Sequence, residues 1–144
     1  MSEDTLPRRS DYVYFRQIPT RWMDNDVYGH VNNVIYYSWF DTAVNGWLIG
    51  NGLLDLETSE IVGIVVATEC TYHKEFTFPQ MVEAGLRVDR LGNSSVTYGV
   101  GLFHEGDDDP AATGTFVHVY TERATRKPVP IPDDVRRMME TLKV

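Results

Sequence analysis

The sequence predicts an α+β domain in which a five-stranded, mostly antiparallel sheet wraps around one long helix. Three observations lead to this prediction: one long apolar helical segment comes early, four β-rich segments follow it, and only short links separate those segments. Short links favour antiparallel neighbours, because a parallel pair needs a crossover of a dozen or more residues. A chain of 144 residues suits a single domain, so we expect residues 1–144 to form one.

The first elements of the chain are a polar start and a strand. Residues 1–10 are polar and are expected to be frayed. Residues 11–22 are rich in aromatic and β-branched side chains, which favours a strand that is interrupted or ends near Pro19.

The helix is predicted from about Asn33 to Leu48. Its polar residues recur at spacings of 3, 1 and 3, which places them on one narrow stripe, and they are Ser38, Asp41, Thr42 and Asn45. The remaining side chains are apolar, so protein should cover most of the helix surface. Gly50 and Gly52 provide the stop.

The rest of the chain is β-rich until a short helix at the end. Residues rich in Val, Thr, Tyr and Phe predict four strands, at 61–75, 82–92, 94–105 and 111–123. A short C-terminal helix is predicted at 133–142, because its apolar residues share one face. The open edges of such a sheet favour a homo-oligomer.

Composition excludes several classes of function. A net charge of −8 argues against nucleic acid or an anionic membrane as the main partner. Cys70 is the single cysteine, so an intramolecular disulfide is impossible, and the dispersed histidines show no ligand spacing; we expect no metal. No apolar run approaches the ~20 residues of a membrane span. The start MSEDTLPRRS lacks an apolar leader, so a cytoplasmic location is expected.

The stretch DNDVYGHVNN, residues 24–33, has two interpretations. As a turn, it has Gly29 for a positive φ and Asn32 or Asn33 to cap the helix. As a site, it places carboxylates beside a helix N-terminus, whose free backbone N–H groups can hold a developing oxyanion. A carboxylate there could act as a base or nucleophile on a bound carbonyl.

The pattern D-x-D-x-x-G-H-V-N-N, followed by Tyr36 and Tyr37, resembles the hotdog-fold acyl-CoA thioesterases of the 4-hydroxybenzoyl-CoA thioesterase family. The resemblance runs from about Tyr12 to Tyr120 and includes the stretch TYHKEFTFPQMVEAGLRV. It implies a hotdog fold, a homodimer or homotetramer, and hydrolysis of an acyl thioester carried by coenzyme A or by acyl carrier protein. It implies no cofactor, since the coenzyme A thioester is the substrate.

The resemblance also implies roles for the residues of the motif. Asp26 matches the catalytic aspartate, acting as nucleophile or as general base for water, whereas Asp24 belongs to the loop. The backbone N–H of Asn33 or of its immediate neighbour is expected to hold the thioester oxygen. Gly29 and His30 are expected to shape and order the loop around this chemistry.

Substrate-binding residues are expected in three further places. Tyr36 and Tyr37 would line an apolar acyl channel between subunits, and the resemblance implies that Ser95 lies near the pantetheine arm. A basic group would receive the phosphates of coenzyme A in this acidic protein; its members are Arg123, Arg126 and Lys127.

Several alternatives remain open from the sequence. Asp41 on the helix stripe, or Glu69 on a strand that passes the helix start, could replace Asp26 as the catalytic carboxylate. A hydratase or dehydratase of the same fold could pair Asp26 with His30. A non-catalytic module that binds acyl thioesters could keep the whole motif.

Overall fold

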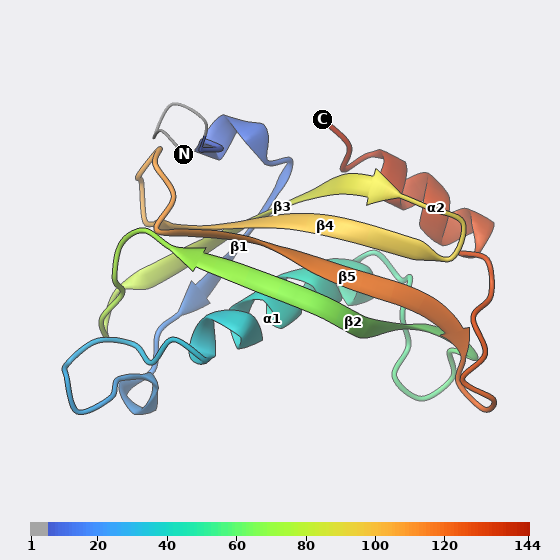
Figure 1. Cartoon of the computed structure of the whole chain (residues 1–144), viewed down its shortest axis with the longest axis horizontal. Helices are drawn as coiled ribbons and strands as arrows, with labels where there is room; N and C mark the ends of the chain where they lie inside the picture. The colour runs from blue at the N-terminus through green and yellow to red at the C-terminus, as the bar shows by residue number, and fades with distance from the viewer. Residues whose placement is uncertain (1–5) are drawn as a thin grey trace.

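The computed structural model describes residues 6–144, and in them a curved sheet wraps around one long helix (Figure 1). In chain order the elements are β1 (Tyr14–Pro19), α1 (Ile35–Gly50), β2 (Ile61–Tyr72), β3 (Met81–Leu91), β4 (Ser95–His104), β5 (Ala112–Glu122) and α2 (Asp133–Glu140). Two 3-10 helices, Arg9–Asp11 and Trp22–Asp24, flank β1.

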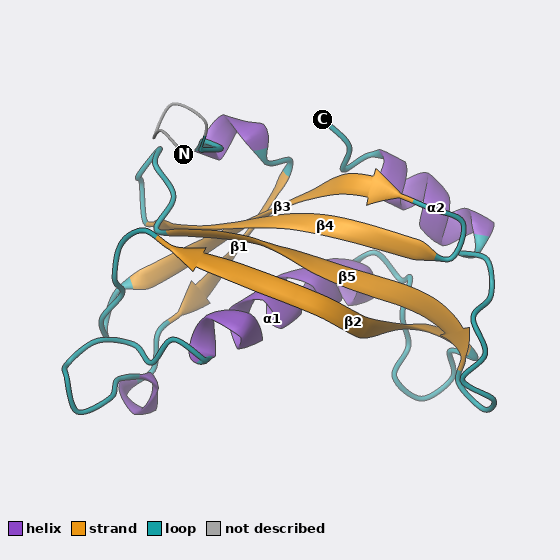
Figure 2. Ribbon diagram, in the orientation of Figure 1, coloured by secondary structure: helices purple, strands orange, loops and turns teal. Residues whose placement is uncertain are grey.

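The sheet has the strand order β1-β3-β4-β5-β2, and each pair of neighbours is antiparallel. β1 and β2 are therefore its two edges. Figure 2 shows α1 lying along one face of the sheet and α2 at one end of it. This arrangement confirms the predicted α+β class and the hotdog fold.

Helix α1 begins two residues later than predicted because the two asparagines before it form a turn. The N–H of Ile35 donates to the carbonyl of Asn32 (2.9 Å), and the Asn32 side-chain oxygen accepts from the N–H of Val34 (3.1 Å). An asparagine that satisfies a free N–H in this way competes with helical geometry at its own position. The helix ends at Gly50, and Gly52 has the left-handed φ (+70°) that ends such helices.

The apolar side of α1 forms the core with the sheet. Phe40 is fully buried, and a Cβ added to Gly114 of β5 would lie 2.6 Å from its ring. The missing side chain at Gly114 therefore lets the ring lie directly on the sheet backbone. Because side chains alternate along a strand, every second residue of β5 on either side of Gly114 also faces α1.

The ends of the chain differ from their predicted bounds. The strand predicted at 11–22 is shortened by the two 3-10 helices, and the helix predicted at 133–142 ends at Glu140. Residues 1–10 were expected to be frayed, and of these, residues 1–5 lie outside the described residues. Arg9, in contrast, is held against the sheet: its guanidinium pairs with Glu83 at 2.9 Å and donates to the Asp107 carbonyl at 2.7 Å.

Strand β2 is long and exposed along much of its length. It contains a bulge between Val65 and Ala67, and large apolar side chains on it face solvent, namely Ile61, Val65, Val66 and Tyr72. An open edge of this kind can pair with another strand. Within residues 6–144, no helix has both the length and the apolar character that crossing a membrane requires.

His118 of β5 is a buried histidine on the face toward α1. Burial lowers its pKa from 6.5 to about 4, so the ring stays neutral at pH 7. Its Nδ1 atom has no hydrogen-bond partner within the described part of the chain. The ring lies over Gly63 of β2, where a Cβ would come within 2.7 Å of Nδ1.

Acid should destabilise the fold through His118. Between pH 6.5 and 4 the His118 ring is protonated in the unfolded chain but stays neutral in the folded protein. The free energy of unfolding therefore falls as the pH falls. From pH 6.5 to 5 the loss of stability amounts to about 1.5 kcal/mol. Urea unfolding at pH 6.5 and at pH 5 should show that the free energy of unfolding decreases less in His118→Phe than in the wild type. An equal loss in both proteins would contradict this origin of the acid sensitivity.

Candidate active site

The DNDVYGHVNN stretch forms a small hairpin immediately before α1. Asn25 and Val31 pair as an antiparallel bridge, and inside it the N–H of Asp26 donates to the carbonyl of His30 (3.0 Å). Gly29 has a φ of +85°, and its N–H donates to the Asp26 carbonyl (3.1 Å). The turn interpretation is therefore correct in its geometry, and Asp26 lies on the turn.

The two aspartates of the motif have different surroundings. Asp24 is 1% exposed, accepts the N–H of Arg21 at 2.8 Å, and forms an ion pair with the Arg21 guanidinium at 2.8 Å. Asp26 is half-buried, and its Oδ1 accepts the N–H of Tyr28 at 2.9 Å. The other Asp26 oxygen has no donor among residues 6–144, so this carboxylate can still accept a proton or attack a carbonyl.

The start of α1 lies a few residues beyond this turn. The backbone N–H of Asn33 has no hydrogen-bond acceptor within the described residues, whereas its carbonyl accepts the Tyr72 hydroxyl at 3.1 Å. Tyr72 ends β2, so the helix start is tied to an edge of the sheet. Asn33 lies two residues before the first residue of α1, so its free N–H is beside the partial positive charge of the helix N-terminus, which favours an oxyanion at this position.

His30 contacts a carboxylate outside the motif. Its Nε2 lies 3.0 Å from the Glu75 carboxylate, and the two side chains are 48% and 71% exposed. An exposed pair of this kind contributes little to stability. The contact is consistent with the orienting role expected for His30.

The two tyrosines of the predicted acyl channel are placed differently. Tyr36 is 2% exposed and belongs to the core, where its hydroxyl accepts the N–H of Phe76 (3.3 Å). In this single chain Tyr36 therefore does not line an open channel, contrary to the expectation from the sequence. Tyr37 is half-buried. Burial is the main cause that raises the pKa of the Tyr72 hydroxyl to about 12, and the neighbouring Cys70 and Tyr37 side chains raise it further.

The other predicted substrate contacts lie far from the Asp26 loop. Ser95 begins β4, and the basic group of Arg123, Arg126 and Lys127 follows β5, at the opposite end of the sheet (Figure 1). Within one chain the structure does not bring them together with Asp26. Arg123 donates to the carbonyl of Leu56 (3.0 Å) in a groove that also contains Glu57, Glu60 and Glu122.

Glu69, a rival carboxylate, is poorly placed, and the thiol of Cys70 is poorly activated. Strand β2 does reach the helix start, because Tyr72 contacts Asn33 there. The strand register pairs Glu69 with Thr115, one position from Gly114, so the Glu69 side chain lies on the face away from α1. Burial raises the pKa of the Cys70 thiol to about 11, which disfavours a thiolate nucleophile.

Asp41 is an exposed residue in the second turn of α1. Its Oδ1 accepts the Asn45 amide at 2.9 Å, while partial burial raises the pKa of the carboxyl group. The stripe of polar residues on which it lies is confirmed as a largely exposed face of the helix.

The sequence interpretation missed an apolar surface around Asp26. Trp22 and Met23 are each 74% exposed and Val27 is 94% exposed, and these side chains line a groove of about 620 Å³ that includes Asp26. The Trp22 ring also packs edge-on against Phe78 with a centroid distance of 5.9 Å. The signal was present in the sequence, since large apolar residues interrupt an otherwise polar loop.

Comparison with known proteins agrees with the fold. A family model described as the thioesterase-like superfamily matches residues 20–139. The PA5185 protein of Pseudomonas aeruginosa strain PAO1 is 52% identical, with a TM-score of 0.93 over 95% of this chain and 96% of that one. The PA2801 protein of the same species, a candidate thioesterase, is 31% identical, with a TM-score of 0.83 over 89% and 98%. The BH1999 gentisyl-coenzyme A thioesterase is 22% identical and shares the fold, with a TM-score of 0.77 over 85% and 99%.

Proposed function

This chain belongs to the thioesterase-like superfamily, and we propose that it hydrolyses acyl-CoA thioesters at the Asp26 loop. One observation carries the assignment of the site. Asp26 has a carboxylate oxygen without a donor on the turn that precedes α1, and the Asn33 N–H, two residues before that helix begins, has no acceptor within residues 6–144. A base and an oxyanion donor are the two groups that acyl transfer needs.

The proposed reaction uses these two groups in turn. The thioester oxygen accepts a hydrogen bond from the Asn33 N–H, and Asp26 either attacks the carbonyl carbon or removes a proton from an attacking water. The carbon–sulfur bond then breaks, and the electron pair leaves with the coenzyme A thiolate. If Asp26 attacks directly, water subsequently hydrolyses the resulting anhydride and restores the carboxylate. The gentisyl-coenzyme A thioesterase of the same fold supports a coenzyme A thioester as the substrate class.

A second copy would complete the site. Antiparallel pairing of β2 with β2 of another copy would place the Ile61 end of one strand beside the Tyr72 end of the other. Ile61 pairs with Glu122, next to the basic group, and Tyr72 contacts Asn33. The basic group of one copy would thus approach the Asp26 loop of the other. Light scattering should give at least twice the mass of one chain, and the mass of a single chain would contradict this assembly.

The activity is tested with a panel of thioesters. The purified protein is incubated with acyl-CoAs of different length, with aromatic acyl-CoAs and with acyl carrier protein thioesters, and free thiol is measured. We expect thiol release from at least one acyl-CoA. No thiol from any thioester would favour a binding module, and hydration of an enoyl thioester without thiol release would favour a hydratase.

A further inference from the structure

The segment 75–80, between β2 and β3, lies directly against the Asp26 loop. We propose that Thr77 of this segment is a positioning residue for thioester hydrolysis, because its hydroxyl joins the two arms of the loop on either side of Asp26. The proposal rests on the proposed function at Asp26. Thr77 makes no contact with Asp26 itself, so any effect on the reaction must act through the loop.

Thr77 makes two contacts with the loop. Its hydroxyl donates to the carbonyl of Gly29 at 2.8 Å and accepts the side-chain amide of Asn25 at 3.4 Å. Asn25 immediately precedes Asp26, and Gly29 closes the turn by donating to the Asp26 carbonyl. The next residue, Phe78, adds a third contact, because its N–H donates to the Asn25 side-chain oxygen at 3.1 Å.

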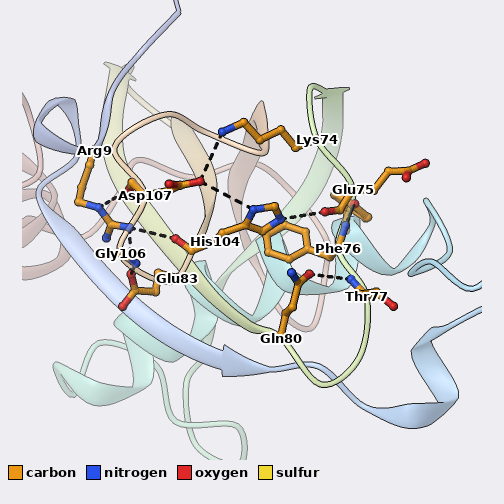
Figure 3. A network of polar contacts seen from close by, with 11 residues as sticks. Arg9, Lys74, Glu75, Phe76, Thr77, Gln80, Glu83, His104, Gly106 and Asp107 are labelled. Carbon is orange, nitrogen blue, oxygen red and sulfur yellow. Dashed lines mark hydrogen bonds and ion pairs between the residues drawn. The ribbon is translucent and has the colours of Figure 1, made fainter.

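Thr77 is itself held in place by Gln80. The N–H of Thr77 donates to the side-chain oxygen of Gln80 (2.9 Å), and the N–H of Gln80 donates to the carbonyl of Thr77 (2.9 Å) (Figure 3). The N–H of Thr20, which follows β1, donates in turn to the Gln80 carbonyl at 3.2 Å. The hydroxyl of Thr77 therefore connects the loop to a segment anchored at the sheet edge.

The start of the same segment is anchored by His104 at the end of β4. The Nε2 of His104 donates to the carbonyl of Glu75 at 2.8 Å, and its ring stacks edge-on against Phe76 with a centroid distance of 4.5 Å. Figure 3 shows His104 between this segment and Asp107, whose carboxylate lies 3.8 Å from Nδ1. Both ends of the segment are thus fixed, so the position of Thr77 is defined by the sheet.

The contact between His30 and Glu75 is the competing explanation for how the loop is held. Both side chains are largely exposed, and exposed pairs contribute little to stability. Thr77 instead contacts a backbone carbonyl and a side chain on opposite arms of the turn. Two contacts that span the turn restrict its shape more than one contact between two exposed side chains.

Positioning matters for the reaction because a displacement of about 1 Å at the reacting atoms can cost roughly 10²-fold in rate. Thr77→Val keeps the shape of the side chain and removes the hydroxyl. We expect its kcat to fall roughly tenfold, because losing one contact should displace Asp26 by less than about 1 Å. KM should stay within about twofold of the wild-type value. Thr77→Ser keeps the hydroxyl and should restore most of kcat.

A matched control removes a similar hydrogen bond elsewhere. The Thr42 hydroxyl on α1 donates to the carbonyl of Ser38 at 2.8 Å, and Thr42→Val makes the same chemical change outside the loop. Its kcat should stay near that of the wild type. Melting temperatures of all variants show whether the Thr77 change acts through overall stability.

Amide hydrogen exchange supplies a readout that does not depend on activity. Exchange in the peptide covering residues 24–31 should accelerate in Thr77→Val and return to the wild-type rate in Thr77→Ser. Unchanged exchange in this peptide, or wild-type kcat in Thr77→Val, would overturn the positioning role. If the wild type hydrolyses no thioester, the proposed function fails, and the exchange experiment still decides whether Thr77 holds the loop.

Discussion

Asp26→Asn should lower kcat for acyl-CoA hydrolysis by roughly 10²- to 10⁴-fold, the usual contribution of a general base or nucleophile. The amide cannot accept the proton of water and cannot attack a carbonyl. Its side-chain oxygen can still accept the N–H of Tyr28, the 2.9 Å contact that Asp26 makes in the turn, so the loop should keep its shape. The measurement is steady-state thiol release, with kcat and KM determined separately.

The control for this prediction is Asp41→Asn. Asp41 is the other carboxylate that the sequence suggests for catalysis, and it lies on the exposed stripe of α1, where it contacts Asn45. We expect its variant to retain activity close to that of the wild type. Full activity in Asp26→Asn would contradict the mechanism, and loss of activity in Asp41→Asn alone would move the catalytic role to the helix.

Phe40→Ala should lower the free energy of unfolding by about 3–5 kcal/mol, the range observed when a buried aromatic ring is truncated to alanine. Phe40 is fully buried where α1 meets the sheet, and the glycine at position 114 leaves its ring in contact with the strand backbone. That backbone can collapse little into the space left by the ring, because β5 is paired with a strand on each side.

The measurement is urea denaturation of both proteins at one fixed concentration. Ile49→Ala on the same helix is the control, since Ile49 is 47% exposed and its truncation should change stability much less. A loss below 1 kcal/mol in Phe40→Ala would show that α1 is not the central core element.

Most of the fold could be predicted because its signals are local. The stripe of Ser38, Asp41, Thr42 and Asn45 predicted the exposed side of α1, and the short links between β-rich segments predicted antiparallel pairing. Element ends were less accurate. At the helix start, for example, the Asn32 side chain accepts the N–H of Val34 and forms a turn where the first helical residues were predicted. Whether a turn or a helix forms at such a position depends on individual atomic contacts, which a sequence pattern does not show.

The site could be predicted in part. The motif located the loop. In the structure Asp24 is paired with Arg21, whereas Asp26 retains an oxygen without a donor within residues 6–144. Catalysis by Asp26 and oxyanion binding by Asn33 stay predictions. Tyr36 was expected to line a channel, but a helix pattern does not distinguish a side chain that faces a channel from one that faces the core.

By itself, the sequence determined the fold class, the long helix and the turn that precedes it, because these depend on residues close together in the chain. Only the tertiary structure decided which distant residues meet: it set Thr77 against Gly29 and placed the basic group at the far end of the sheet from Asp26. The physical reason is that strand order and register fix such contacts, and both are set by packing across the whole sheet rather than by any short stretch of sequence.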